Sequence, residues 1–351
     1  MLLASVSVAL PGSSASRGFA STIARLSEDG GFFDSNNLVS NERSYLHVVP
    51  ALREARLEGG VYLGVGPDQN FTYIAHTRPS VAFIVDIRRD NLLLHLLFKA
   101  LFQLSSTRAE YLSALCGRSA PSGGSWKDEG IERIADYVEG AAAPPDIVES
   151  LRARVNAVIK GFGLPLSGED FETIDRFHRT FIDRGLGLQF ESAGRPPRRY
   201  YPTYRELLLE TDNAGQRCNY LASERDFQFV RALQRRDLVI PVVGDLAGTT
   251  AVPAIGRLLR ERRQKLSAFY TSNVEYYLSG PAYPRFLENL RALPHNNRSV
   301  IIRAIFPNRY GWVPTTGPNY LSASQVQRVD ELLAAAAAGR IQSYRDLLDG
   351  R

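Results

Sequence analysis

The sequence feature that most constrains the fold is a short apolar run of β-type residues followed almost at once by a long apolar helical segment. Residues 81–87 read VAFIVDI, and residues 91–104 read NLLLHLLFKALFQL. A strand with almost no polar alternation is typical of a parallel sheet that is covered on both faces. A helix that is apolar nearly all round is buried rather than half-exposed. Together the two segments predict an α/β protein with a buried parallel sheet.

The same alternation of strand-like and helical segments recurs along most of the chain. Further β-type runs occupy residues 60–64, 238–243, 266–270 and 299–306, and helical periodicity occupies 223–235, 251–264 and 284–293. This order predicts a doubly wound, mostly parallel sheet with helices on both faces. Pro241 favours an edge or a bulge for its strand, because proline cannot donate a hydrogen bond to a neighbouring strand.

One long segment, residues 105–222, interrupts the alternation. Its helical patterns, separated by glycine-, serine- and proline-rich breaks, predict a mainly helical insertion or cap. The α/β domain is then built from two parts, residues 35–104 and 223–310. We expect residues 1–34 to be a poorly ordered leader and residues 311–351 to be a C-terminal loop and helix.

The composition excludes several classes of protein. The two cysteines, Cys116 and Cys218, cannot build a disulfide framework or a four-thiolate zinc site, and the five histidines include no pair at i, i+4. We therefore expect no metal site. No apolar run approaches the roughly 20 residues that span a membrane. The apolar stretch 2–10 has no positive charge before it, so we expect a cytoplasmic protein, with an N-terminal export signal as the alternative.

The charge balance leaves a nucleic-acid partner open without favouring it. The chain carries 42 basic and 37 acidic residues, and only four of the basic residues are lysines. Arginine binds phosphate and carboxylate through paired hydrogen bonds. Part of the arginine excess gathers in residues 195–205, where it is interleaved with tyrosines. That segment could hold a nucleic-acid strand or an anionic substrate, and we favour a solvated, proline-kinked connector instead.

Glycines and polar residues follow four of the predicted strands. The first strand ends in Gly64-Val65-Gly66, and the second ends at Asp86, 22 residues after Gly64. Asp245 and the pair Ser272-Asn273 follow two later strands. Ligands of open α/β sheets bind at the carboxyl ends of the strands, where glycine allows close approach and an acid accepts hydrogen bonds from a ribose. The four ends therefore predict a ligand site on one edge of the sheet.

On these residues the chain resembles the class I S-adenosylmethionine-dependent methyltransferases, over roughly residues 60–104 and 223–306. The resemblance implies a Rossmann-like fold of the methyltransferase type and S-adenosylmethionine as the cofactor. It also implies that Gly64 and Gly66 approach the methionine part of the cofactor. Stretches such as RRYYPTYRELLLE and AFYTSNVEYYL are also similar to those of an uncharacterised bacterial protein family.

The same resemblance assigns further positions. It implies that Asp86 binds the ribose hydroxyls and Asp245 the adenine amine, and Asp68, at the place of a third glycine, completes the cofactor-binding set. Ser272, Asn273 and Tyr201 are expected to line the substrate, a methyl acceptor of unknown class. No catalytic residue is assigned, because proton removal often does not need to precede methyl transfer.

Two alternatives stay open beside the methyltransferase. The spacing of Asp86 also permits a nicotinamide-dependent oxidoreductase, although Gln69 stands where the dinucleotide fingerprint has its third glycine. A non-catalytic Rossmann-like binding protein would keep the fold, and its mark would be a filled crevice beside Gly64. Methyl transfer and aminocarboxypropyl transfer from the same cofactor are not distinguished by the sequence.

Overall fold

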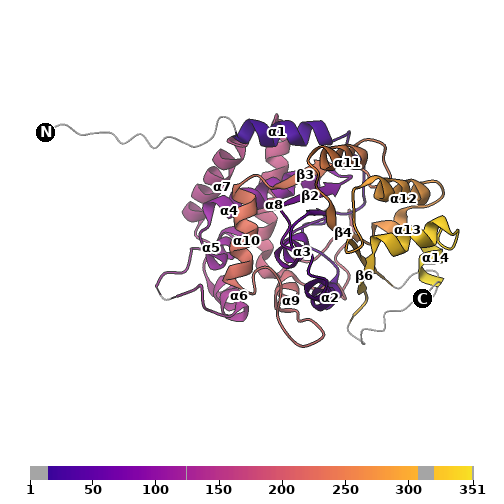
Figure 1. The fold of residues 1–351 in the computed structure, drawn as a ribbon. Helices are drawn as coiled ribbons and strands as arrows, with labels where there is room; N and C mark the ends of the chain where they lie inside the picture. The colour runs from indigo at the N-terminus through magenta and orange to yellow at the C-terminus, as the bar shows by residue number, and fades with distance from the viewer. Residues whose placement is uncertain (1–14, 124, 307–319, 350–351) are drawn as a thin grey trace.

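The computed structural model describes residues 15–123, 125–306 and 320–349, which form a six-stranded sheet with helices on both faces (Figure 1). The strands are β1 Val61–Gly64, β2 Val81–Asp86, β3 Val239–Val243, β4 Leu266–Ser272, β5 Val300–Ile305 and β6 Ala323–Arg328. Their order is β3-β2-β1-β4-β5-β6, and every neighbouring pair is parallel except β5 with β6. The predicted α/β class and the mostly parallel sheet are confirmed.

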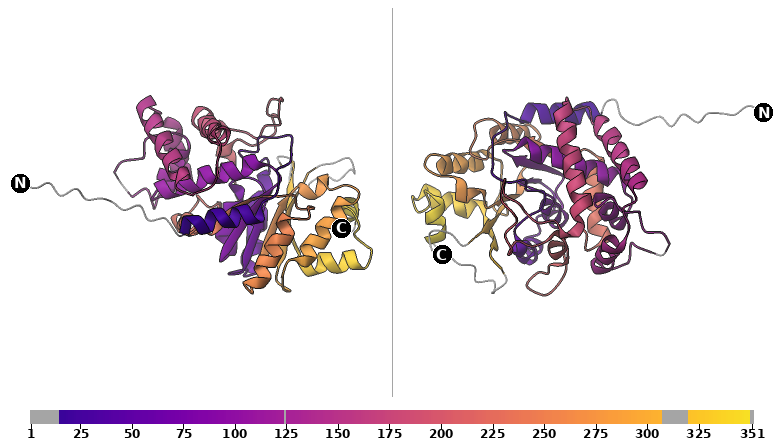
Figure 2. Two further views of the ribbon diagram at one scale, coloured as in Figure 1. Left: turned by 90° about the horizontal axis from the view of Figure 1, so that it is seen from above. Right: turned by 180° about the vertical axis from the view of Figure 1, so that it is seen from behind.

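The strands carry apolar side chains on both faces, and helices cover both faces of the sheet. The helices are α1 Ala15–Leu26, α2 Val49–Glu54, α3 Gln69–Thr77, α4 Arg89–Leu104, α5 Arg108–Leu115, α6 Ile131–Gly140, α7 Pro145–Lys160, α8 Gly168–Arg184, α9 Tyr204–Leu209, α10 Glu224–Arg235, α11 Ala251–Glu261, α12 Ala282–Ala292, α13 Val329–Ala337 and α14 Tyr344–Asp349. Helices α3, α4 and α10 lie together on one face, whereas α11, α12 and α13 follow one another on the other. The insertion helices α5, α7 and α8 pack on the outer side of α4, as the views of Figure 2 show.

One local feature agrees with the sequence prediction, and two differ from it. Strand β3 is an edge strand of the sheet, as Pro241 predicts. Residues 15–34, expected to be poorly ordered, include helix α1, which buries Phe19, Ile23 and Leu26 and packs against β3 and α11. Residues 1–14 of the expected leader lie outside the described residues. The C-terminal segment, expected to be loop and helix, contains β6 before α13 begins.

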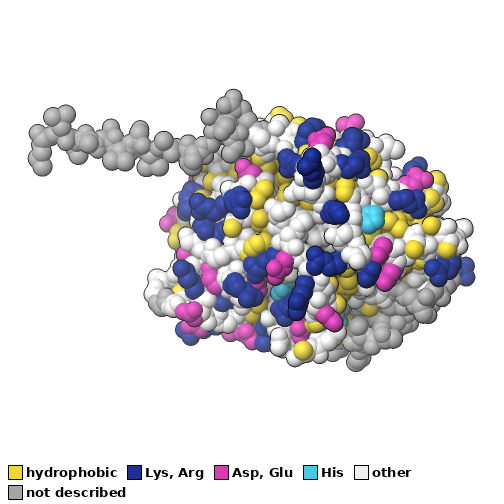
Figure 3. Space-filling view, viewed as in Figure 1, with side chains coloured by type: hydrophobic (Ala, Val, Ile, Leu, Met, Phe, Trp, Pro, Cys, Tyr) yellow, Lys and Arg dark blue, Asp and Glu magenta, His cyan; other side chains and the backbone are white. Residues whose placement is uncertain are grey.

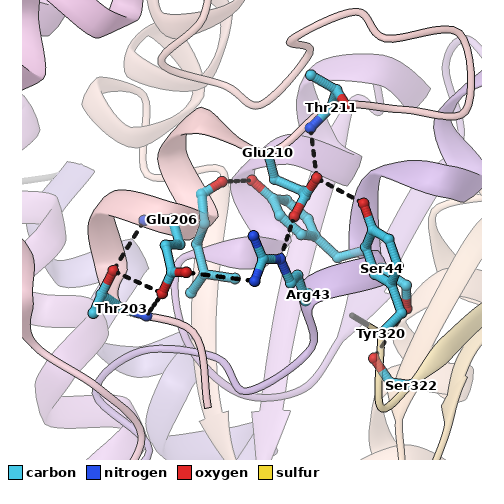
Figure 4. A network of polar contacts seen from close by, with 10 residues as sticks. Arg43, Ser44, Thr203, Glu206, Glu210, Thr211, Tyr320 and Ser322 are labelled. Carbon is cyan, nitrogen blue, oxygen red and sulfur yellow. Dashed lines mark hydrogen bonds and ion pairs between the residues drawn. The ribbon is translucent and has the colours of Figure 1, made fainter. Parts of the chain in front are cut away.

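The insertion is fastened to the core through helix α9. Thr203 and Glu206 cap this helix reciprocally, because each side chain accepts from the other residue's backbone N–H. Arg43, at the start of the 3-10 helix Arg43–Val48, lies between Glu206 (3.4 Å) and Glu210 (2.8 Å), and Tyr320 donates to Glu210 at 3.0 Å (Figure 4). Because Glu210 is buried, removal of Arg43 would leave its carboxylate without a charged partner and would destabilise the fold. The network therefore joins the insertion, the segment before β1 and the C-terminal region.

No helix within the described ranges is both long and apolar enough to cross a membrane.

Candidate functional site

The carboxyl ends of the parallel strands meet at one edge of the sheet, and β1 is the strand at which the connections change direction. β1 pairs with β2 on one side and with β4 on the other, so the helices that follow these strands lie on opposite faces. In register, Gly64 of β1 lies between Ile84 of β2 and Tyr270 of β4. Such a switch point leaves a crevice outside the strand ends, where open α/β sheets bind their ligands.

The glycine turn after β1 is required by the chain's own packing. A Cβ on Gly64 would lie 1.9 Å from Oδ1 of Asn70 and 2.7 Å from the ring of Tyr62. Tyr62 donates to Asn70 Oδ1 at 2.9 Å, and Asn70 Nδ2 donates to the carbonyl oxygens of Val65 and Pro67, both at 2.8 Å. Gly66 has a φ of +79°, a conformation that favours glycine. Asn70 thus fastens the turn from inside, and the space beside Gly64 is filled.

Asp68 points towards the insertion. Its carboxylate is buried and accepts hydrogen bonds from the hydroxyls of Tyr204 (2.6 Å) and Tyr220 (3.1 Å). Burial raises the pKa of Asp68 to about 6, although the two tyrosine hydrogen bonds act in the opposite direction. Both tyrosines belong to the insertion, so Asp68 joins the core to the insertion.

Asp86 ends β2 and is paired with Arg88. Oδ1 of Asp86 accepts from the backbone N–H and from Nε of Arg88, both at 3.0 Å, and Oδ2 accepts from Nη2 at 2.9 Å. Arg88 also donates to the carbonyl oxygens of Ser35 (3.0 Å) and Asn36 (3.2 Å). A carboxylate has about four acceptor positions, so Asp86 keeps one on Oδ2.

Residues 27–36, which we term the N-terminal strap, cross the ends of β3 and β2. The backbone N–H of Glu28 donates to Val243 at 3.0 Å, and that of Gly31 donates to Ile87 at 2.7 Å. The carboxylate of Glu28 accepts from the backbone N–H of Asp245 at 2.7 Å. The strap therefore occupies the crevice between β2 and β3, where the resemblance places the adenine. The Asp245 carboxylate accepts from Ala247 N–H at 2.9 Å, within its own loop.

Glu42 is a functional candidate that the sequence prediction missed. It lies beside the end of β4, is 1% exposed, and accepts from Gln69 (2.8 Å), Tyr270 (2.7 Å) and Ser272. Burial raises its pKa. Ser272 has a φ of +52°, which is strained for a residue with a side chain. A buried carboxylate held against a strained serine at a switch point is an arrangement found at active sites. Glu42 directly precedes a helix, so its sequence signal is that of a helix cap.

The expected substrate-lining residues lie in one neighbourhood. Tyr277, in the 3-10 helix Val274–Tyr277 after β4, lies near Asn273 and near Tyr201 of the insertion. Tyr201 in turn lies near Asn41, the neighbour of Glu42 in the sequence. Asn273 and Tyr201, 72 residues apart in the chain, are thus brought to the same side of the β4 end as Ser272 and Glu42.

Several buried polar atoms beside the glycine turn have no hydrogen-bond partner among the described residues. They are Ser35 Oγ, Asn36 Oδ1, Gln69 Oε1, both amide atoms of Asn91, and His95 Nδ1. His95 Nε2 contacts the carbonyl oxygen of Gly66 at 2.8 Å, and Asn91 lies one helical turn before it on α4. A buried polar atom without a partner costs about 1–3 kcal/mol, so a ligand or ordered water is expected against them.

An open pocket of about 990 Å³ lies over the start of α4. It is lined by residues 30–33, 35 and 36 of the strap, by Arg88, Arg89 and Asp90, and by residues 184 and 191–197 of the insertion. Its volume is that of a site for a nucleotide-sized ligand. In the part of the chain that the structure describes, no three His, Cys, Asp or Glu side chains gather as metal ligands would.

Comparison with known protein families identifies the family to which the chain is similar. The model of a family described as a domain of unknown function, DUF7790, matches residues 37–162 and 186–349. Both α/β parts and most of the insertion are covered, whereas α1 and the strap up to residue 36 lie outside the match. No curated protein matches the chain.

Proposed function

From the premise that the chain belongs to the DUF7790 family, and from the geometry of its strand ends, we propose that it is a Rossmann-like transferase that uses S-adenosylmethionine. The cofactor would bind at the end of β2 and the start of α4 rather than against Gly64, because Asn70 and Tyr62 fill the space beside Gly64, as the non-catalytic alternative also expects. The observation that carries the proposal is the group of buried, unpartnered polar atoms at this place, above all Gln69 Oε1 and the amide of Asn91. A cofactor with amino, carboxylate and hydroxyl groups offers partners to each of them.

The residues at β1 and β2 fit this cofactor. Gln69 and Asn91 would hold its amino-acid part, and the remaining acceptor position of Asp86 Oδ2 would take a ribose hydroxyl. The residues at β3 do not fit it with the strap in place, because Glu28 accepts from the Asp245 N–H and the strap thereby lies over the end of β3, where the adenine amine would meet the Asp245 carboxylate. We therefore expect binding to require that the strap leaves the end of β3.

The reacting groups would meet beside the end of β4. S-adenosylmethionine supplies an activated methyl group on its sulfonium, and the protein contributes position and the fate of one proton. Glu42 accepts a hydrogen bond from Ser272, so the acceptor's proton could reach the Glu42 carboxylate through the Ser272 hydroxyl. Burial raises the pKa of Glu42, which makes it a better proton acceptor than an exposed glutamate.

Isothermal titration of the full chain with S-adenosylmethionine and S-adenosylhomocysteine tests the proposal. Gln69→Leu and Asn91→Leu should each weaken binding at least about tenfold, which corresponds to 1.4 kcal/mol. Glu28→Ala should strengthen it, because the variant loses the hydrogen bond that holds the strap over Asp245 at the end of β3. Gln264→Leu is the matched control, since its side-chain oxygen is also buried and unpartnered but borders a different pocket, beside the amino-terminal ends of the strands. Absence of binding by both the native chain and Glu28→Ala at millimolar ligand would overturn the proposal.

A nicotinamide-dependent oxidoreductase is the second candidate, and one observation favours it. Arg88 and Arg89 stand two and three residues after Asp86, and an arginine near this place accommodates the 2′-phosphate of NADP in dinucleotide-binding folds. A fluorescence titration with NADPH separates the candidates. Binding of NADPH without binding of S-adenosylmethionine would replace the first proposal, and binding of neither by the native chain or Glu28→Ala would favour a non-catalytic protein.

A further inference from the structure

The pocket over the start of α4 has a composition that the cofactor does not explain. Its lining contains four arginines, Arg88, Arg89, Arg184 and Arg195, against two acids, Asp90 and Glu191. S-adenosylmethionine carries a positive sulfonium and has no phosphate, so an excess of guanidinium groups does not suit it. The pocket lies between the strap and the insertion.

Three of these arginines come from separate segments, and each forms an ion pair with one carboxylate. Arg89 at the start of α4 pairs with Asp170 at 2.7 Å, Arg184 at the end of α8 pairs with Glu191 at 3.5 Å, and Arg195 pairs with Asp34. Their side chains remain 49%, 56% and 56% exposed. Since a guanidinium has five N–H donors, each can hold a carboxylate and still donate to a second anion.

Aromatic side chains border the same pocket. Phe32, 83% exposed, and Phe33 line it, and Phe33 meets Tyr277 edge-on with ring centroids 5.0 Å apart. Tyr277 and Tyr200 are each 51% exposed, and Tyr200 contacts Tyr201. Exposed apolar side chains that lie together and are rimmed by polar residues mark binding surfaces, and Phe32 and Phe33 lie together among the arginines of this pocket. Planar rings beside guanidinium groups suit a ligand that joins a planar ring to an anion.

The base of the pocket offers donors for an anion. Helix α4 has sixteen residues and begins here, with no side chain capping its N-terminus. The first N–H groups of a helix attract negative charge. Independently of the helix, Ser35 lines the pocket, is 8% exposed, and its hydroxyl has no hydrogen-bond partner among the described residues.

We propose that this pocket binds a nucleoside phosphate, with its phosphate at Arg89, Arg184, Arg195 and Ser35 and its base against Phe32 and Phe33. The phosphate is carried either by a free nucleotide or by a single-stranded nucleic acid that enters past Tyr200 and Tyr277. Figure 3 shows basic side chains intermixed with acidic ones over the face it presents, so that face is not one broad basic field. The identification of this ligand as the methyl acceptor rests on the proposed function. The binding of the ligand to the pocket does not depend on that function.

The test measures binding of uridine 5′-monophosphate, uridine, and a fluorescein-labelled ten-nucleotide uridine RNA to the full chain without cofactor. We expect the monophosphate to bind at least tenfold more tightly than uridine. The double variant Arg184→Gln/Arg195→Gln should lose at least tenfold in affinity and Phe32→Ala about fivefold. Arg133→Gln/Arg328→Gln is the matched control, because these arginines are also exposed and paired with acids but lie elsewhere, and its affinity should change less than twofold.

The outcomes separate the two sources and the two proposals. Tighter binding of the RNA than of the monophosphate identifies a strand as the ligand, and similar or weaker binding identifies a free nucleotide. Equal binding by the arginine variant and its control overturns the inference. Absence of binding of both the monophosphate and the RNA overturns it as well. Displacement of the nucleotide by S-adenosylmethionine also overturns it, because the pocket would then be the cofactor's. If S-adenosylmethionine fails to bind while the nucleotide binds, the transferase proposal fails and this site stands.

Discussion

The buried carboxyl of Asp68 makes the stability of the whole chain depend on pH. Its pKa is raised from the ordinary value of 3.8 to about 6, chiefly by burial. In the unfolded chain it returns to about 3.9, so between pH 4 and pH 6 the folded protein binds the extra proton. Stability contributed by the protonated carboxyl is therefore full below pH 4 and is lost as the pH rises through 6. A difference of about two pKa units corresponds to about 3 kcal/mol.

Asp68→Asn removes this dependence. The amide matches the volume of the protonated carboxyl, and its oxygen can take the position of Oδ2, which accepts from the hydroxyls of both Tyr204 and Tyr220. Relative to the native chain, the variant should be more stable at pH 7.5 by up to about 3 kcal/mol and nearly equal in stability at pH 4. Urea unfolding at a series of pH values measures the difference. Asp183→Asn, at an exposed position on α8, is the control. A variant that is destabilised equally at both pH values would refute the reasoning.

Three further changes test other parts of the structure. Glu42→Gln should abolish transfer and leave the melting temperature within a few degrees of the native value, since the amide keeps the hydrogen bonds of Tyr270 and Ser272. Transfer by the variant at the native rate in a steady-state assay would exclude Glu42 as the proton acceptor. Lys99→Met should lower the free energy of unfolding, measured in urea, by about 1–3 kcal/mol and expose α1 to proteolysis, because Lys99 pairs with Asp237 at 2.7 Å and lies over the ring of Phe19. Undiminished stability of the variant would contradict a structural ion pair. Cys116 and Cys218, whose thiol pKa values burial raises to about 12, should not react with Ellman's reagent at pH 8 until the chain unfolds, and rapid reaction would show that they are accessible.

The layered fold could be predicted from the sequence because the strands are buried on both faces and read as continuous apolar runs. The edge position of β3 followed from one proline. Strand β6 could not be predicted in this way, since ASQVQR alternates with polar residues and is half-exposed. Helix α1 could not be predicted in this way either, because small and polar residues separate Phe19 and Ile23 and leave few apolar residues at helical spacing.

The candidate site was predictable only where a strand end marks it. Asp86, Asp245 and Ser272 lie at strand ends, so the fold alone brings them to one edge of the sheet. Glu42 and its partner Tyr270 are separated by 228 residues, and no local pattern connects them. The pairing of Asp86 with Arg88 was equally invisible, because an acid two residues before an arginine is common in any loop.

The contacts of the N-terminal strap have a consequence for how the chain is made. The hydroxyl of Ser27 accepts from Val243, and Glu28 accepts from Asp245, across separations of 216 and 217 residues. At about 5–20 residues per second, a ribosome needs on the order of 10–40 s to complete that interval. During this time α1 has left the ribosome, but β3 and α11, against which it packs, do not yet exist. Nascent chains of this protein are therefore expected to expose an apolar helix for most of their synthesis and to depend on a chaperone that shields it.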